Sequence, residues 1–151
     1  EVFLNLILLE GVLNSTSILI SEKNVKVDFD TEKDIFLYAD EFKIEEVVTN
    51  YISNAINHVN DNGTIRINVS EDDKDICFSV YNTGKQIPEK DLYNVWEKFF
   101  KVDKAHSRSY GGSGIGLSIV KAIVEAHGGA VRVVNKTDGV EFSFKIPRMK
   151  E

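Results

Sequence analysis

Apolar and polar positions along the chain follow two periods, which alternate in blocks. Apolar residues recur at helical spacing in three segments, at 5–23, 40–60 and 114–127. They alternate with polar residues, as in half-buried strands, at 25–29, 65–70, 76–80, 131–133 and 142–146. Two further short apolar segments, at 1–4 and 35–39, are also predicted to be strands.

Turn residues indicate how these segments connect. Thr31 to Asp34 is predicted to join 25–29 and 35–39 as a pair of strands, and Asp72-Asp73 and Asp138-Gly139 are predicted to close two further hairpins. Three helices and about six or seven strands, mostly in hairpins, predict an α+β fold. We expect a two-layer sandwich in which helices cover one face of a mixed, mostly antiparallel sheet.

The helix predicted from Asp40 to about residue 60 has an unusual polar face. Its apolar side gathers Ile44, Val48, Tyr51, Ile52, Ala55 and Val59. The opposite side carries Glu46 and three amides, Asn50, Asn54 and Asn57. Asn is a poor helix former at positions where a solvated face usually has Lys or Glu, so these amides indicate a face that coordinates something. An amide oxygen suits a Mg²⁺ ion that is also bound to phosphate and water, although a simple polar face is the alternative.

Four glycines in six residues, from Gly111 to Gly116, run directly into the third helix. Glycine allows main-chain N–H groups to approach a ligand closely, and the positive end of the helix dipole favours phosphate. Side-chain cations stand just upstream, at Lys101, Lys104, His106 and Arg108. The stretch matches neither G-x-x-x-x-G-K-[ST] nor G-x-G-x-x-G. The alternative is a mobile linker that caps a core helix.

Composition narrows the class of protein. The chain has 151 residues, enough for one domain, with 42% hydrophobic and 28% charged residues. Its net charge of −6 argues against a nucleic-acid surface. Cys77 is the single cysteine, so no disulfide forms within the chain and a reducing compartment is expected. The apolar run from Val2 to Ile20 is too polar to span a bilayer, and an N-terminal Glu1 indicates a piece of a longer protein.

The order of these features resembles the catalytic ATP-binding domain of sensor histidine kinases, in the superfamily shared with gyrase, Hsp90 and MutL ATPases. The motifs are an Asn-x-x-x-Asn helix, a strand-end turn closing in Ile-Pro, a Phe-rich segment and Gly-Gly-x-Gly-x-Gly-Leu. The resemblance covers essentially the whole chain. It implies that residues 1–151 form one catalytic domain of the Bergerat, or GHKL, fold with a mobile ATP lid, without the phosphoacceptor histidine domain or the sensor region.

The resemblance assigns roles to individual residues. Asn54 is the implied Mg²⁺ ligand, and Asn50 lies beside the phosphates, where gyrase-type ATPases have a Glu that activates water. Because Asn cannot act as a general base, phosphoryl transfer without efficient hydrolysis is implied. Asn50, Lys101 and Arg108 are the implied catalytic residues, and the lid is implied at about 102–111. The nucleotide-binding set is completed by Asn57, His58, Asn82, Gly84, Ile87, Phe99, Gly112, Gly114, Ile115, Gly116 and Leu117.

Three positions depart from the residues usual in that family. Asn82 stands where a carboxylate commonly accepts a hydrogen bond from adenine N6. An amide carbonyl can accept this bond while its NH₂ group donates to a ring nitrogen, so adenine binding is expected to survive. Gln86 replaces a second glycine of the same loop. Asn57 replaces a basic residue, which removes a charge partner of the phosphates.

The implied partners are ATP and ADP, the dimerisation and histidine phosphotransfer domain of the same parent kinase and, indirectly, a response regulator. None of His58, His106 and His127 lies in a His-Glu-x-x-x-Pro-like context, so the acceptor histidine is expected on another domain. We expect no nucleic-acid or membrane contact and a cytoplasmic location, as the cytosolic part of a membrane-anchored sensor. Two alternatives are a degenerate, regulatory nucleotide-binding module and a hydrolytic ATPase of the same superfamily.

Overall fold

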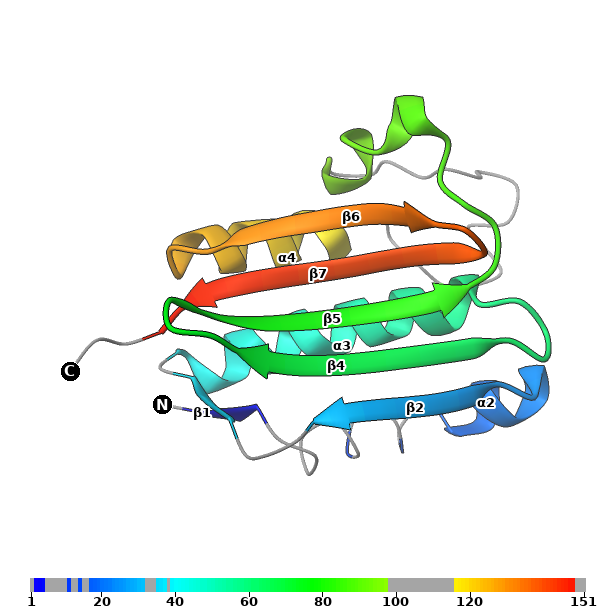
Figure 1. The fold of residues 1–151 in the computed structure, drawn as a ribbon, viewed down its shortest axis with the longest axis horizontal. Coiled ribbons are helices and arrows are strands. Elements are labelled where there is room, and N and C mark those ends of the chain that lie inside the picture. The colour runs from blue at the N-terminus through cyan, green and yellow to red at the C-terminus, as the bar shows by residue number, and fades with distance from the viewer. Residues whose placement is uncertain are drawn as a thin grey trace.

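The protein is built as a layer of helices on one face of a five-stranded sheet (Figure 1). This computed structural model describes residues 2–4, 11, 14, 17–31, 35–37, 39–97 and 116–148. In space the strands follow the order β2 (Lys26–Thr31), β4 (Thr64–Glu71), β5 (Asp75–Thr83), β7 (Gly139–Pro147) and β6 (Ala130–Lys136). β2 and β4 are parallel, and the other neighbours are antiparallel. The predicted two-layer α+β fold is therefore confirmed.

Helices and short 3₁₀ turns accompany this sheet in the described segments. The helices are α2 (Ser17–Lys23), α3 (Glu41–His58) and α4 (Gly116–Ala126), and the 3₁₀ turns are η1 (Glu89–Asp91) and η2 (Asn94–Trp96). α3 and α4 lie behind the sheet in the view of Figure 1. α3 begins where predicted because Asp40 Oδ1 accepts a hydrogen bond from the Lys43 N–H at 3.1 Å. α4 is followed by Gly128 at φ 79°, a left-handed conformation typical of a helix end.

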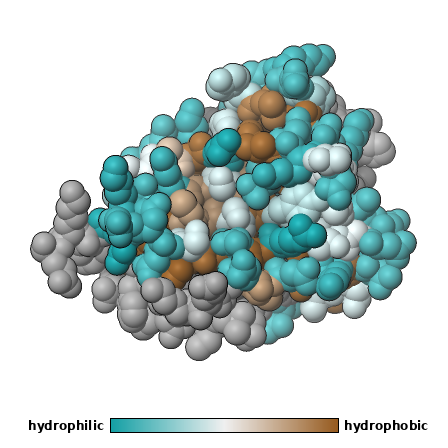
Figure 2. All heavy atoms as spheres, in the orientation of Figure 1, coloured by the Kyte–Doolittle hydropathy of each residue, from teal (hydrophilic) through white to brown (hydrophobic). Residues whose placement is uncertain are grey.

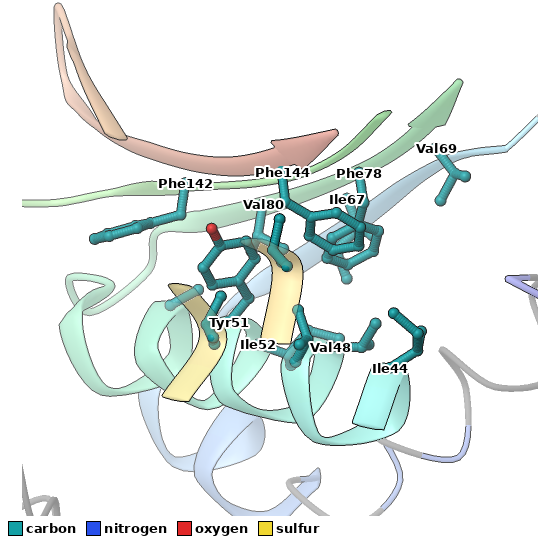
Figure 3. Packing of buried hydrophobic residues seen from close by; sticks show 14 of the residues in the cluster. Ile44, Val48, Tyr51, Ile52, Ile67, Val69, Phe78, Val80, Phe142 and Phe144 are labelled. Carbon is teal, nitrogen blue, oxygen red and sulfur yellow. The ribbon is translucent and has the colours of Figure 1, made fainter. Parts of the chain in front are cut away.

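The core lies between α3 and the sheet, and Tyr51 stands at its centre (Figure 3). The Tyr51 ring lies parallel to Phe78, with centroids 6.5 Å apart, and packs at a tilt against Phe142 at 5.7 Å. Its hydroxyl donates to the Ser143 carbonyl at 2.8 Å. Burial raises the pKa of Tyr51, so the hydroxyl stays protonated and remains a donor. This contact ties the middle of α3 to β7.

Figure 2 shows the opposite side of the sheet, in the orientation of Figure 1, as a surface of hydrophilic residues with hydrophobic ones between them. Tyr81 also points to this side of the sheet, but it is only 8% exposed. The Arg66 guanidinium lies 5.4 Å from the centre of its ring, and its hydroxyl donates to Asp138. Burial, this hydrogen bond and the charge of the carboxylate raise the pKa of Tyr81 to about 12.

The predicted pairing of 25–29 with 35–39 is wrong. β2 pairs in parallel with β4, where Val27 lies opposite Ile65 and Phe29 opposite Ile67. The second segment contains β3 (Ile35–Leu37), which pairs antiparallel with β1 (Val2–Leu4) in a separate two-stranded sheet. The parallel arrangement needs a crossover connection, and α3 provides it between β3 and β4. A short turn in the sequence does not reveal that the next helix leads back to the same sheet.

Candidate functional site

The polar face of α3 meets the beginning of α4 at Asn50. The Asn50 Nδ2 group donates to the Glu46 carbonyl at 2.9 Å, which fixes the orientation of the amide. A Cβ atom built on Gly116 would lie 2.8 Å from Asn50 Oδ1, closer than such atoms normally approach. Glycine at position 116 therefore lets the first turn of α4, with its N–H groups, lie directly against this amide.

The end of α3 meets the end of β5 at Gly84. Gly84 has φ 142°, and a Cβ atom there would lie 2.7 Å from the His58 carbonyl oxygen and 3.6 Å from Asn82 Nδ2. Asn82 is only 2% exposed, and among the described residues it is the one buried polar side chain. Its Nδ2 group donates to the Thr83 carbonyl at 3.1 Å. The amide has a second N–H and a carbonyl oxygen with which to recognise a ligand.

A hydroxyl network beside Asn82 was not predicted from the sequence. Thr83 Oγ1 donates to Asn60 Oδ1 at 2.7 Å and accepts from the Thr64 N–H at 2.9 Å. The Asn60 N–H in turn donates to the Thr83 carbonyl at 3.2 Å. These bonds fasten the chain beyond α3 to the end of β5. A single Thr in a strand carries no recognisable signal for such a role.

The end of α3 also receives a cation from α2. The Lys23 ammonium donates to the carbonyls of Ile56 at 2.8 Å, Asn57 at 3.2 Å and Val59 at 3.1 Å. Burial lowers the pKa of Lys23, and the charge of Asp61 opposes this shift. Desolvation, with repulsion from Lys23 as the smaller cause, lowers the pKa of His58. His58 is therefore mainly neutral at pH 7, since its ordinary pKa is about 6.5.

The described site residues fall into two groups along α3. Asn50 and Gly116 meet at one end, and His58, Asn82 and Gly84 meet at the other. His58 follows Asn50 by eight positions along the helix, which is roughly 12 Å at 1.5 Å per residue. Asn54 lies between them with a half-buried side chain. The two ends can therefore hold the two ends of one extended ligand.

Several predicted site residues lie outside the described part of the chain. These are Phe99, Lys101, Arg108, Gly112, Gly114 and Ile115, together with the predicted lid at 102–111. Asn57, Ile87 and Leu117 are described and half-buried. Leu117 follows Gly116 in the first turn of α4, and Asn57 lies in the last turn of α3. No helix of the described segments is long and apolar enough to cross a bilayer.

Comparison with known proteins identifies this arrangement. Residues 39–150 match the model of the family described as "Histidine kinase-, DNA gyrase B-, and HSP90-like ATPase". The chain belongs to this family. It is 37% identical over 123 residues to the sensor histidine kinase WalK of Bacillus subtilis, and the aligned region covers 80% of this chain and 20% of WalK. It is 38% identical over 128 residues to the sensor protein KdpD of Clostridium acetobutylicum, and this aligned region covers 83% of this chain and 14% of KdpD.

Solved structures give the same result for the fold. The nucleotide-free catalytic domain of histidine kinase ThkA superimposes with a TM-score of 0.83 at 31% identity, covering 97% of this chain and 95% of that one. ThkA in complex with the response regulator protein TrrA matches with a TM-score of 0.81 at 30% identity, covering 98% and 42% of the two chains. The resemblance read from the sequence is confirmed, and the chain spans a fifth or less of WalK and KdpD.

The chemistry of α3 fits the cation that accompanies ATP. Asn54 lies at the edge of the buried face of α3, where its side chain is half-buried, and it does not belong to the hydrophobic core. A neutral oxygen ligand suits Mg²⁺ when phosphate oxygens and water supply the remaining coordination. In this histidine kinase-like domain, Asn54 would hold the ion between the two ends of the site.

Proposed function

We propose that this domain binds Mg-ATP and presents the γ-phosphate to a histidine on the separate dimerisation domain of its parent sensor kinase. The observation that carries the proposal is the two-ended site along α3, with a buried amide at one end and a helix start at the other. Membership of the ATPase family supports nucleotide binding. The parent is proposed to act in two-component signalling from the cytoplasmic side of a membrane, and to pass its phosphoryl group to a response regulator.

The base of the nucleotide is assigned to the end formed by Asn82 and Gly84. A buried amide can accept a hydrogen bond from adenine N6 and donate one to a ring nitrogen, and this pairing selects adenine over guanine. Gly84 brings the backbone close to this position without a side chain in the way. His58 forms a neutral wall of the same end, because its pKa is lowered.

The phosphates are assigned to the end formed by Asn50 and Gly116. The first N–H groups of α4 have no partner within the helix, and together with the helix dipole they favour an anion. Mg²⁺ bound at Asn54 would neutralise charge on the phosphate oxygens. Lys101 and Arg108, proposed from the sequence, would add the side-chain cations that stabilise the transferring phosphoryl group.

Two features favour transfer over hydrolysis. Asn50 cannot deprotonate water, because an amide is not a base. The described histidines are also poor acceptors: His58 is a wall of the site, and His127 connects the two helices. His127 Nε2 accepts from the Asp40 N–H at 3.3 Å, while its Nδ1 donates to the Ile123 carbonyl at 2.8 Å. We therefore place the accepting imidazole on another domain.

The proposal is tested by incubating this chain with ATP labelled at the γ-phosphate, alone and with the histidine-bearing domain of the same parent. We expect no label on the chain itself and acid-labile label on the added domain. Asn54→Ala should abolish this transfer. Label on a histidine of the isolated chain, or steady phosphate release without an acceptor, would show that the chemistry is assigned wrongly. The second of these results would favour a hydrolytic ATPase.

Asn57 favours one alternative function, that of a regulatory module. An uncharged residue there removes a phosphate partner, as expected of a regulatory module that binds nucleotide weakly. Calorimetric titration with ATP, with and without Mg²⁺, separates the two functions. A kinase domain should bind ATP more tightly with Mg²⁺, whereas an interaction module should show no Mg²⁺-dependent affinity.

A further inference from the structure

The loop that leaves β5, at residues 84–88, is held by hydrogen bonds to the turn between β6 and β7, at residues 136–139. Figure 1 shows the chain rising from the end of β5, past this turn, toward η1. The Gly84 N–H donates to the Asp138 carbonyl at 2.9 Å. The Gln86 side-chain amide donates to the Lys136 carbonyl. Gln86, one of the departures from the family's usual residues, thus forms a hydrogen bond with this turn.

Asn135, which lies in β6 just before this turn, makes two further hydrogen bonds to the loop. Its Oδ1 atom accepts from the Ile87 N–H at 2.9 Å, and its Nδ2 group donates to the Ile87 carbonyl at 2.7 Å. One side chain therefore satisfies both backbone groups of one residue, as a neighbouring strand would. Only an amide side chain has a donor and an acceptor side by side in this geometry. Asp, Ser or Ala at this position could not form both bonds.

Asn135 also lies on the side of the sheet that carries the site. It is opposite Val140 in the β6–β7 ladder, and Val140 is opposite Asn82 in the β5–β7 ladder. Val140 is 4% exposed and belongs to the hydrophobic core. The same row across three strands therefore carries the amide that braces Ile87 and the buried amide assigned to adenine.

We propose that Asn135 is a positioning residue for the base-binding end of the site, where it holds Ile87 and the 84–88 loop against the edge of the adenine position. The inference rests on the proposed function. Asn135 itself does not touch the nucleotide. It fixes the backbone on which Gly84 and Ile87 stand, so that this wall is already formed before a nucleotide arrives and need not be ordered during binding.

The test compares two variants that each lose one amide from the sheet. Asn135→Ala removes both bonds to Ile87. Asn68→Ala is the matched control, because Asn68 lies on the open face of β4, where its Nδ2 group donates to Asp30 Oδ2 at 3.1 Å. Dissociation constants for ATP, ADP and adenosine are measured by calorimetry, with and without Mg²⁺. The melting temperature of each free variant is measured in parallel.

Asn135→Ala should weaken binding about thirtyfold, since two ordinary hydrogen bonds together correspond to roughly this factor. The factor should be the same for ATP, ADP and adenosine and should not depend on Mg²⁺, because the loop faces the base and not the phosphates. In transfer to the histidine-bearing domain, KM for ATP should rise while kcat stays unchanged. Asn135→Asp, which keeps an acceptor for the Ile87 N–H but cannot donate, should fall between the wild type and Asn135→Ala.

The outcomes separate this inference from the proposed function. Unchanged affinity in Asn135→Ala overturns the inference alone. A loss confined to Mg-ATP, or an equal loss in Asn68→Ala, also overturns it, because the effect would then lie at the phosphates or in the sheet as a whole. No binding of any adenine compound by the wild type would overturn the proposed function and this inference with it. If Asn135→Ala does not fold, Asn135→Asp and Asn135→Ser supply the same comparison.

Discussion

Replacing Asn54 by Ala should make the domain more stable and less able to bind Mg-ATP. Asn54 lies in the interior of α3, as the fourteenth of its 18 residues. Its side chain is half-buried on the polar face, outside the core that Tyr51 and Ile52 form. The substitution therefore removes a poor helix former without opening a cavity.

The expected stabilisation follows from helix propensity. Ala is better than Asn in a helix interior by about 0.6 kcal/mol. For a domain of about 150 residues this corresponds to a rise of roughly 1–2 °C in melting temperature. Binding should change in the opposite direction. Loss of the amide ligand should weaken Mg-ATP binding at least about tenfold, which corresponds to roughly 1.4 kcal/mol, and the difference between titrations with and without Mg²⁺ should disappear.

Thermal unfolding of the free protein and calorimetry with ATP measure the two effects separately. Ser53→Ala is the control, because Ser53 is the preceding residue of α3 and is also half-buried. It should raise stability in the same way and leave Mg-ATP affinity unchanged. If Asn54→Ala binds Mg-ATP as tightly as the wild type, Asn54 is not the ligand and the amide face of α3 is only a polar surface. A lower melting temperature would show that the amide has a structural partner.

Two further substitutions test the core and the base end. Tyr51→Phe keeps the ring but leaves the Ser143 carbonyl without its 2.8 Å hydrogen bond, so urea unfolding should show a loss of about 1–2 kcal/mol, with ATP affinity unchanged. An undiminished free energy of unfolding would contradict this. The lowered pKa of His58 means that the unfolded chain binds a proton more readily than the folded one. The folded protein is therefore most stable, with respect to His58, above the pKa of about 6.5 that this residue has in the unfolded chain, and it loses stability as the pH falls below that value. His58→Asn should therefore lose less stability than the wild type between about pH 7.5 and pH 5.5, and equal losses in urea unfolding would refute the assignment.

Much of the fold was predictable because the relevant signals are local. Asp40 supplies an N-cap, and the apolar positions of α3 recur at helical spacing, so both the start and the buried face of the helix were predicted correctly. The helix ends at His58, two residues before the predicted end. The β4–β5 and β6–β7 hairpins were predicted because each combines strict alternation with a short polar turn. In each case the information lies within about ten neighbouring residues.

Other features depend on residues that are distant in the sequence. β2 pairs with β4 across α3, and nothing near residue 31 distinguishes this from a hairpin. Asn135 lies 48 residues from Ile87, and its role follows only from the meeting of a loop with a turn. By contrast, Asn50 and Gly116, which also meet across a long separation, were predicted through family resemblance. Family motifs predict candidate ligand-binding residues, whereas the residues that hold those candidates in place are seen only in the fold.

Lys23 is a cation that contacts position 57, where the basic residue usual in the family is missing. Lys23 places its ammonium beside the Asn57 carbonyl, yet an ammonium has three N–H donors, and the carbonyls of residues 56, 57 and 59 accept from all of them. It lies at the His58 end of α3, roughly 12 Å along the helix from Asn50. Lys23 therefore neutralises the negative end of the helix dipole and does not replace the missing phosphate partner. In the function proposed above, the positive charge for the phosphates would therefore come from the start of α4, from Mg²⁺ and from the proposed cations Lys101 and Arg108. The absence of a basic residue at position 57 would leave a larger share of the phosphate contacts to those two side chains.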